Sequence, residues 1–152
     1  MNDGAPLVLD ENDAVTIGYV TNFYTLLRAI DEAMPKYAVL YLEGTAVAPD
    51  VASFLESRRA PNPRQISPNT LWPKPKAFHL PLAGDNLAEL RKLAAQHAPP
   101  EVADHLVVYY NEAVYLWAHD AGYGYVDVAR YLSESIIESL RNALGDAIKG
   151  KR

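Results

Sequence analysis

The sequence contains no cysteine. Disulfide bonds, thiolate catalysis and cysteine-ligated zinc are therefore excluded. Its first residues, MNDGAPLVLDEND, are acidic and lack the basic and apolar regions of a signal peptide. No apolar run approaches the roughly 20 residues that are needed to span a bilayer. We therefore expect a cytoplasmic protein with no membrane contact.

Motifs for metal or nucleotide binding are also absent from the sequence. The four histidines (His79, His97, His105 and His119) show none of the HxH, HxxxH or HExxH spacings of metal sites. The run AGYGYVD lacks the lysine and the spacing of a phosphate-binding loop, and no GxSxG motif is present. The sequence thus predicts no metal ion and no cofactor.

Acidic residues outnumber basic ones, but the basic residues that exist are concentrated. Residues 58–76, RRAPNPRQISPNTLWPKPK, hold five positive charges, five prolines and no acid, in a chain of net charge -5. Subtracting these five charges leaves -10 for the remainder. Proline at this density prevents regular structure, so the segment is expected to be a long basic loop. The surrounding negative charge disfavours binding to nucleic acid.

The remaining pattern predicts one α+β domain over residues 1–152. We expect helices at 13–34, 49–57, from residue 85 or 86 up to the prolines at 99–100, and a long C-terminal helix at 126–148. Short apolar runs predict strands at 37–42 and 77–82 and a β-hairpin at 105–119 in the C-terminal half. The predicted fold therefore has four helices and about four strands.

The hairpin is apolar on both faces if Asn111 and Glu112 form its loop. Val108 then lies opposite Tyr115, and Leu106 lies opposite Trp117. Because both faces need a cover, we expect helices on both sides, or else a ligand or a second subunit on one of them. Tyr115 and Trp117 are the aromatic candidates for such a binding face.

The same register places Asp104 beside His119 at the open end of the hairpin, with His105 near Asp120 on the other face. A carboxylate that orients an imidazole is the arrangement a general base needs, because it sets the tautomer and stabilises the imidazolium. The simpler interpretation is that these side chains hydrogen-bond to loop amides.

The basic loop is the second candidate site. Arg58, Arg59, Arg64, Lys74 and Lys76 can surround an anion, with arginine making bidentate contacts to phosphate or carboxylate. Trp72 can hold the loop against the domain. The alternative is a plain connection whose charges serve solubility alone.

No specific catalytic motif is present, which favours a non-catalytic binding or regulatory protein that acts through the aromatic hairpin face and the basic loop. Its partner is a small anion, another protein or a second copy of the chain. The alternative is a small enzyme with His119 as base, Asp104 as its orienting acid and an anionic substrate held by the loop.

Overall fold

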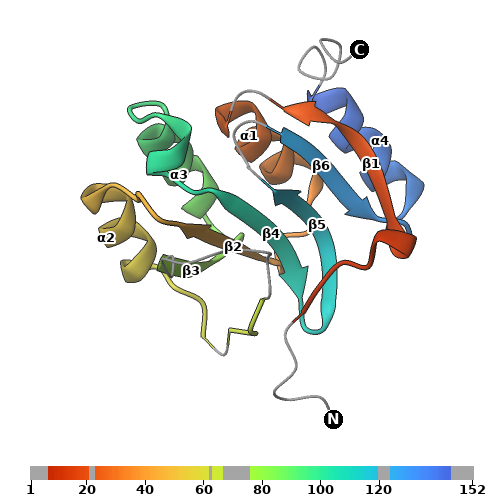
Figure 1. Cartoon of the computed structure of the whole chain (residues 1–152), viewed down its shortest axis with the longest axis horizontal. Coiled ribbons are helices and arrows are strands. Elements are labelled where there is room, and N and C mark those ends of the chain that lie inside the picture. Colours follow the sequence, from red (N-terminus) through yellow and green to blue (C-terminus); the bar gives the residue numbers. More distant parts are fainter. Residues whose placement is uncertain (1–6, 21–22, 62, 67–75, 120–123, 145–152) are drawn as a thin grey trace.

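The computed structural model describes residues 7–20, 23–61, 63–66, 76–119 and 124–144 (Figure 1). This part of the chain forms one antiparallel sheet of six strands in the order β1-β6-β5-β4-β2-β3. The strands are β1 (Ala14–Val20), β2 (Val39–Gly44), β3 (Lys76–Pro81), β4 (His105–Tyr110), β5 (Ala113–His119) and β6 (Gly124–Ala129). The helices are α1 (Phe23–Ala33), α2 (Pro49–Ser57), α3 (Asn86–Ala94) and α4 (Glu134–Leu144), with short 3-10 turns η1 (Glu11–Asp13) and η2 (Pro99–Glu101).

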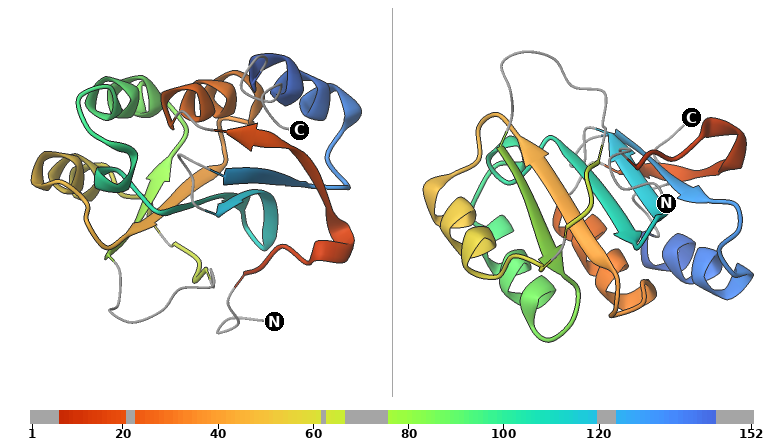
Figure 2. Two further views of the ribbon diagram at one scale, coloured as in Figure 1. Left: turned by 45° about the horizontal axis from the view of Figure 1, so that its top comes forward. Right: turned by 90° about the horizontal axis from the view of Figure 1, so that it is seen from below.

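The two faces of the sheet have different covers. The four α-helices lie on one face, and extended segments cross the other (Figure 2). Leu7 and Ile66 form a parallel bridge there, and the Leu7 N–H donates to the Gln65 carbonyl at 2.7 Å. Both hairpin faces are covered, but the expectation of helices on both sides is wrong: helices cover one face, and extended chain segments cover the other.

Side chains that alternate along the strands form two hydrophobic cores, one on each face of the sheet. The larger core lies between the sheet and the helices, and its strand residues include Leu40, Leu42, Leu106, Val108, Leu116, Val126 and Val128. The smaller core lies beneath the extended segments and contains Leu7, Tyr41, Ile66, Val107, Tyr109 and Val114. Because side chains alternate between the faces of a strand, neighbouring residues of β4 belong to different cores.

The predicted strand number is wrong, because the described sheet has six strands rather than four. Residues 14–20 form β1 instead of the start of the first helix, and residues 124–129 form β6 instead of the start of the last. Both segments are rich in β-branched residues, which pack well on a pleated sheet. Their apolar residues continue the spacing of the helix that follows. The sequence pattern therefore predicts helices that begin too early in the chain.

The hairpin loop is confirmed, but the register beyond it is wrong. Tyr110 pairs with Ala113 as expected, and Asn111 takes the left-handed conformation with φ 52°. A bulge between Val108 and Tyr109 then shifts the pairing by one residue. Val108 pairs with Leu116, Leu106 with Ala118, and His105 with His119.

Helix α2 and strand β3 lie where the sequence predicts them, whereas α3 begins at the predicted Asn86 but ends at Ala94, before the prolines at 99–100. Pro49 occupies the first turn of α2, where its missing N–H costs nothing. β3 is an edge strand, which tolerates Pro81 for the same reason. The α4 helix begins only at Glu134, and the Ser133 Oγ accepts the Ile136 N–H at 3.3 Å. Ile148, the last residue of the predicted C-terminal helix, lies outside the described residues.

Candidate functional site

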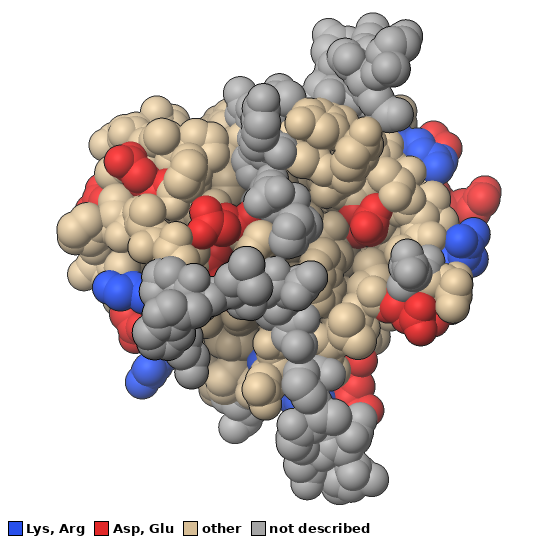
Figure 3. All heavy atoms as spheres, in the orientation of Figure 1, with Lys and Arg blue, Asp and Glu red and all other residues tan. Residues whose placement is uncertain are grey.

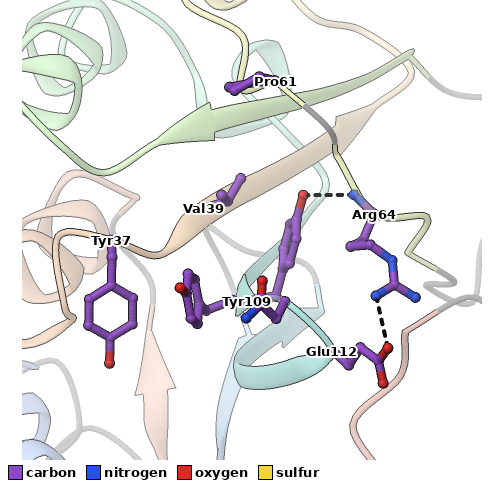
Figure 4. Close-up of a pocket in the computed structure, with 8 residues that line it drawn as sticks. Tyr37, Val39, Pro61, Arg64, Tyr109 and Glu112 are labelled. Carbon is purple, nitrogen blue, oxygen red and sulfur yellow. Dashed lines mark hydrogen bonds and ion pairs between the residues drawn. The ribbon is translucent and has the colours of Figure 1, made fainter. Parts of the chain in front are cut away.

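A cavity of about 610 Å³ lies at the end of the sheet that carries the β4–β5 turn (Figure 4). The residues that line it come from the start of β2, the basic segment, the end of β4 and the turn. They are Tyr37, Val39, Pro61, Arg64, Tyr109, Tyr110, Asn111 and Glu112. The cavity is therefore the place where the basic segment and the aromatic hairpin meet.

Arg64 is held in this cavity by contacts on both its backbone and its side chain. Its backbone N–H donates to the Tyr109 hydroxyl at 3.1 Å, and Ile66 is buried two residues further on. Its guanidinium lies 3.7 Å from the Glu112 carboxylate, and the Arg64 side chain is 21% exposed (Figure 4). An ion pair this long, with an exposed glutamate, contributes at most about 1 kcal/mol. A ligand anion can therefore compete with Glu112 for the guanidinium.

Tyrosine side chains form the opposite wall of the cavity. Tyr37 and Tyr110 contact each other edge to face, with ring centroids 4.5 Å apart, and Tyr37 lies across the cavity from Arg64 (Figure 4). The two rings are 59% and 38% exposed. Tyr115 of the bulged strand shares a hydrogen bond with Tyr37, and burial together with this bond raises the pKa of Tyr115 to about 12. Tyrosines exposed in this way are typical of binding surfaces.

The other described cations of the predicted basic loop do not gather around one anion. Arg58 donates to Asn86 at 2.7 Å and to Asp85 at 3.2 Å, and its guanidinium lies over the Phe54 ring. Arg59 pairs with Glu56 at 3.6 Å.

Lys76 lines a separate cavity beside α2. Trp72, Lys74 and Asp120 lie outside the described residues. On the face drawn in Figure 3, the Lys and Arg side chains are spread along the margin rather than collected in a patch.

Trp117 and Tyr115 occupy opposite sides of the sheet, contrary to the predicted register. Trp117 packs, half-buried, on the smaller core beside Val107, whereas Tyr115 packs on the larger core. The physical reason is the bulge, which reverses the faces of the residues that follow it.

The bulge also changes the backbone pairing at the open end of the hairpin, and the His119 side chain lies outside what the structure describes. The backbone partner of His119 is His105, and the Asp104 carboxylate accepts the Thr45 N–H at 3.1 Å and the Thr45 hydroxyl at 3.3 Å. Asp104 thus makes the loop contacts of the simpler interpretation. The length of β4, roughly 17–20 Å for six residues, lies between this corner and the cavity that holds Arg64.

A buried polar cluster on the smaller core was not anticipated from the sequence. The Tyr41 hydroxyl donates to Glu43 Oε1 at 2.6 Å, and Glu43 is only 3% exposed. Glu43 Oε2 has no hydrogen-bond partner in the part of the chain described here. The His79 Nδ1 lies 2.8 Å from the Tyr109 hydroxyl, and burial lowers the pKa of His79 to about 4.

The signal for this cluster was present in β2. Tyr41 and Glu43 lie on the same face of a strand whose other face is apolar.

Among the described residues, no group of three His, Asp or Glu side chains is placed to hold a metal ion. In the same part of the chain, no helix has both the length and the apolar character needed to cross a membrane.

His97 forms a second polar cluster, away from the sheet. Its Nε2 lies 3.0 Å from Asp50 in α2, and its Nδ1 lies 3.0 Å from Glu101 in η2. Because both ring nitrogens face carboxylates, the doubly protonated imidazolium is favoured. The hydrogen bonds to Asp50 and Glu101 raise the pKa of His97, and the bond from His97 lowers the pKa of Asp50.

We expect His97→Gln to destabilise the protein most between the ordinary pKa values of Asp50 and His97, which are 3.8 and 6.5. A raised histidine pKa stabilises the fold below its unfolded value, and this contribution is lost as pH rises through the folded value. A lowered aspartate pKa has the reverse dependence, so its contribution is lost in acid. Urea unfolding of both proteins at about pH 5.5 and about pH 8.5 measures the difference. A difference that does not shrink at the higher pH contradicts this prediction.

Comparison with known proteins supplies no relative: no family model, no curated protein and no solved structure matches this chain. The class that the fold itself defines is an α+β domain with helices on one face of an antiparallel sheet.

Proposed function

We propose that this protein is a non-catalytic binding or regulatory protein whose ligand site is the cavity at the β4–β5 turn. The observation that carries the proposal is the convergence of Arg64 from the basic segment with Tyr37, Tyr109 and Tyr110. A concave site with aromatic walls and few charged groups is the usual form of a ligand pocket. Of the residues predicted for the basic loop and the aromatic hairpin face, the proposal keeps Arg64 in the site and replaces Trp117 by Tyr109 and Tyr110.

The charges in the cavity favour a ligand that carries an anionic group. Arg64 is the cation that lines the cavity, and its ion pair with Glu112 is weak enough for a ligand anion to compete with that carboxylate. The tyrosine rings can pack against the apolar or planar part of the same ligand. An aromatic carboxylate has both features, and benzoate is its simplest representative.

A titration of the nitrogen-15-labelled protein with benzoate and with inorganic phosphate tests the proposal. We expect benzoate to shift the backbone amides of Tyr37, Arg64 and Tyr109. The variant Arg64→Gln should lose this response. Glu112→Gln should bind several-fold more tightly, because it removes the carboxylate that competes for Arg64.

Arg59→Gln serves as the matched control, since Arg59 is an exposed arginine of the same segment that pairs elsewhere. It should respond as the unmodified protein does. A further cavity between α1 and α3 is lined by Tyr24, Ala88 and Arg91. Shifts confined to that cavity, or a response that survives Arg64→Gln, would contradict the proposal. A homodimer built on this surface would instead show the same amides shifting with protein concentration.

A further inference from the structure

Three ionisable residues lie next to one another across the sheet, on the face opposite the α-helices. Glu43 of β2 pairs directly with His105 of β4, and His105 pairs in turn with His119 of β5. Residues that pair directly across antiparallel strands share one face of the sheet. That face is the one of the smaller core, because it also carries Tyr41, two residues before Glu43. We call Glu43, His105 and His119 the polar row.

The members of the row whose side chains the structure describes are buried. Glu43 is 3% exposed, and His105 is 8% exposed. His119 belongs to the row through its backbone pairing with His105. Charged and polar side chains are rarely buried to this extent unless they are paired or bind a metal ion.

The two carboxylate oxygens of Glu43 differ in their contacts. Oε1 accepts the Tyr41 O–H at 2.6 Å. Oε2 has no hydrogen-bond partner in the described ranges of the chain. A buried polar atom without a partner carries a cost that a bound ion or donor removes. Carboxylates that bind metals are commonly oriented by a hydrogen bond of this kind, which leaves the second oxygen for the metal.

The backbone fixes the spacing between Glu43 and His105. The Asp104 N–H donates to the Glu43 carbonyl at 2.7 Å. Gly44 packs so closely on the start of β4 that an added Cβ would lie 3.3 Å from the Asp104 nitrogen. Directly paired residues have Cβ atoms about 4.5–5.5 Å apart. Neighbouring histidine and carboxylate side chains at this spacing can reach one ion, since zinc–nitrogen and zinc–oxygen bonds are about 2.0–2.2 Å long.

From this arrangement we propose that the polar row binds one divalent transition-metal ion. Its ligands are Glu43 Oε2 and one ring nitrogen from each of His105 and His119. Two histidines with one carboxylate form the ligand set of known zinc and iron(II) sites. Histidine spacing along the chain does not reveal this set, because its members come from three strands.

The metal site and the proposed ligand cavity are independent. His105 is the first residue of β4, whereas the cavity is lined by Tyr109 and Tyr110 at the other end of the strand. The inference therefore goes beyond the proposed function and does not depend on it.

A zinc titration of the chelator-treated protein tests the inference. We expect calorimetry to give one zinc ion per chain. In the nitrogen-15-labelled protein, zinc should shift the backbone amides of Glu43, His105 and His119. Shifts confined to His97 and the two exposed carboxylates that flank it would show an adventitious ion only, and they would overturn the inference.

Substitutions separate the ligands from the residues around them. Tyr41→Phe removes the hydrogen bond that orients the carboxylate and should lower zinc affinity about 10–100-fold. Loss of a ligand costs more than loss of such an outer contact, so Glu43→Gln, His105→Gln and His119→Gln should each lower the affinity at least about 100-fold. His97→Gln is the matched control and should bind zinc as the unmodified protein does.

Zinc affinity that survives His105→Gln or His119→Gln overturns the inference, as does an affinity that falls in His97→Gln alone. If a variant does not fold, the amide shifts of the unmodified protein still decide between the two places. The benzoate titration is a separate test. A response to benzoate without zinc binding excludes the metal site alone, and zinc binding without a response to benzoate excludes the proposed function alone.

Discussion

Replacing Leu116 by alanine is expected to lower the free energy of unfolding by about 2–5 kcal/mol. Leu116 is 0% exposed and lies in the larger core. It belongs to β5, which pairs with β4 on one side and with β6 on the other. Truncation loses the burial of its side chain and leaves a cavity that the surrounding strands and helices cannot fill completely. The large value follows from the bulge, which turns Leu116 toward the helices.

Chemical denaturation of the folded protein and the variant measures this loss. Val8→Ala is the control, since Val8 is 62% exposed and its truncation should change stability by no more than about 0.5 kcal/mol. A Leu116→Ala variant as stable as the Val8→Ala variant would show that Leu116 does not face the larger core. The shifted register would then be wrong.

Replacing Tyr41 by phenylalanine is expected to cost about 1–3 kcal/mol, although it removes a single oxygen atom. The Tyr41 hydroxyl is the donor to Glu43 Oε1, and Glu43 Oε2 already has no partner among the described residues. Without the Tyr41 hydroxyl, Oε1 also loses its donor, so neither oxygen of this buried carboxylate keeps a hydrogen bond among the described residues. Burial, with the hydrogen bond and the charge of Glu43, raises the pKa of Tyr41 above its usual range, so the phenol keeps its proton.

A double-mutant cycle with Glu43→Gln separates the hydrogen bond from other effects of Tyr41→Phe. Glutamine keeps an oxygen acceptor but carries no charge, so Tyr41→Phe should cost less in that background. Tyr24→Phe, at an exposed tyrosine, should be nearly neutral. If Tyr41→Phe costs the same in the unmodified protein and in the Glu43→Gln variant, the two side chains are not coupled.

Local signals in the sequence were sufficient for several elements. Pro49 marks the start of α2, the prolines at 99–100 follow α3, and Asn111 with Glu112 forms the hairpin loop. Each of these depends on the backbone preference of one or two residues, which acts without tertiary contacts. The α+β class follows from the same alternation of short apolar runs and longer stripes.

Strands β1 and β6 could not be separated from the helices beside them in the same way. Each is a short apolar segment next to an amphipathic helix, and periodicity alone does not distinguish such a segment from an extension of the helix. The two strands pair with each other, Val15 opposite Val128. Their stability therefore depends on partners more than 100 residues apart, which local patterns do not report.

Among the described residues that the sequence predicts to bind a ligand, Arg64 lines the cavity, and Tyr115 hydrogen-bonds to Tyr37 in its wall. Tyr37 and Tyr109 were not predicted, because nothing in the sequence places them beside a segment that follows α2. The register from which the Asp104–His119 pair is predicted is wrong, because one bulged residue changes it.

The sequence by itself determined the absence of cysteine chemistry, the concentration of positive charge in residues 58–76, and the elements whose ends are set by proline or by the hairpin loop. Only the tertiary structure decided how many strands the sheet has, which hairpin residues share a face, and which arginine meets the tyrosines. The reason is physical. Backbone preference and side-chain period act over a few residues, whereas strand pairing, bulges and charge pairing depend on which distant segments pack together.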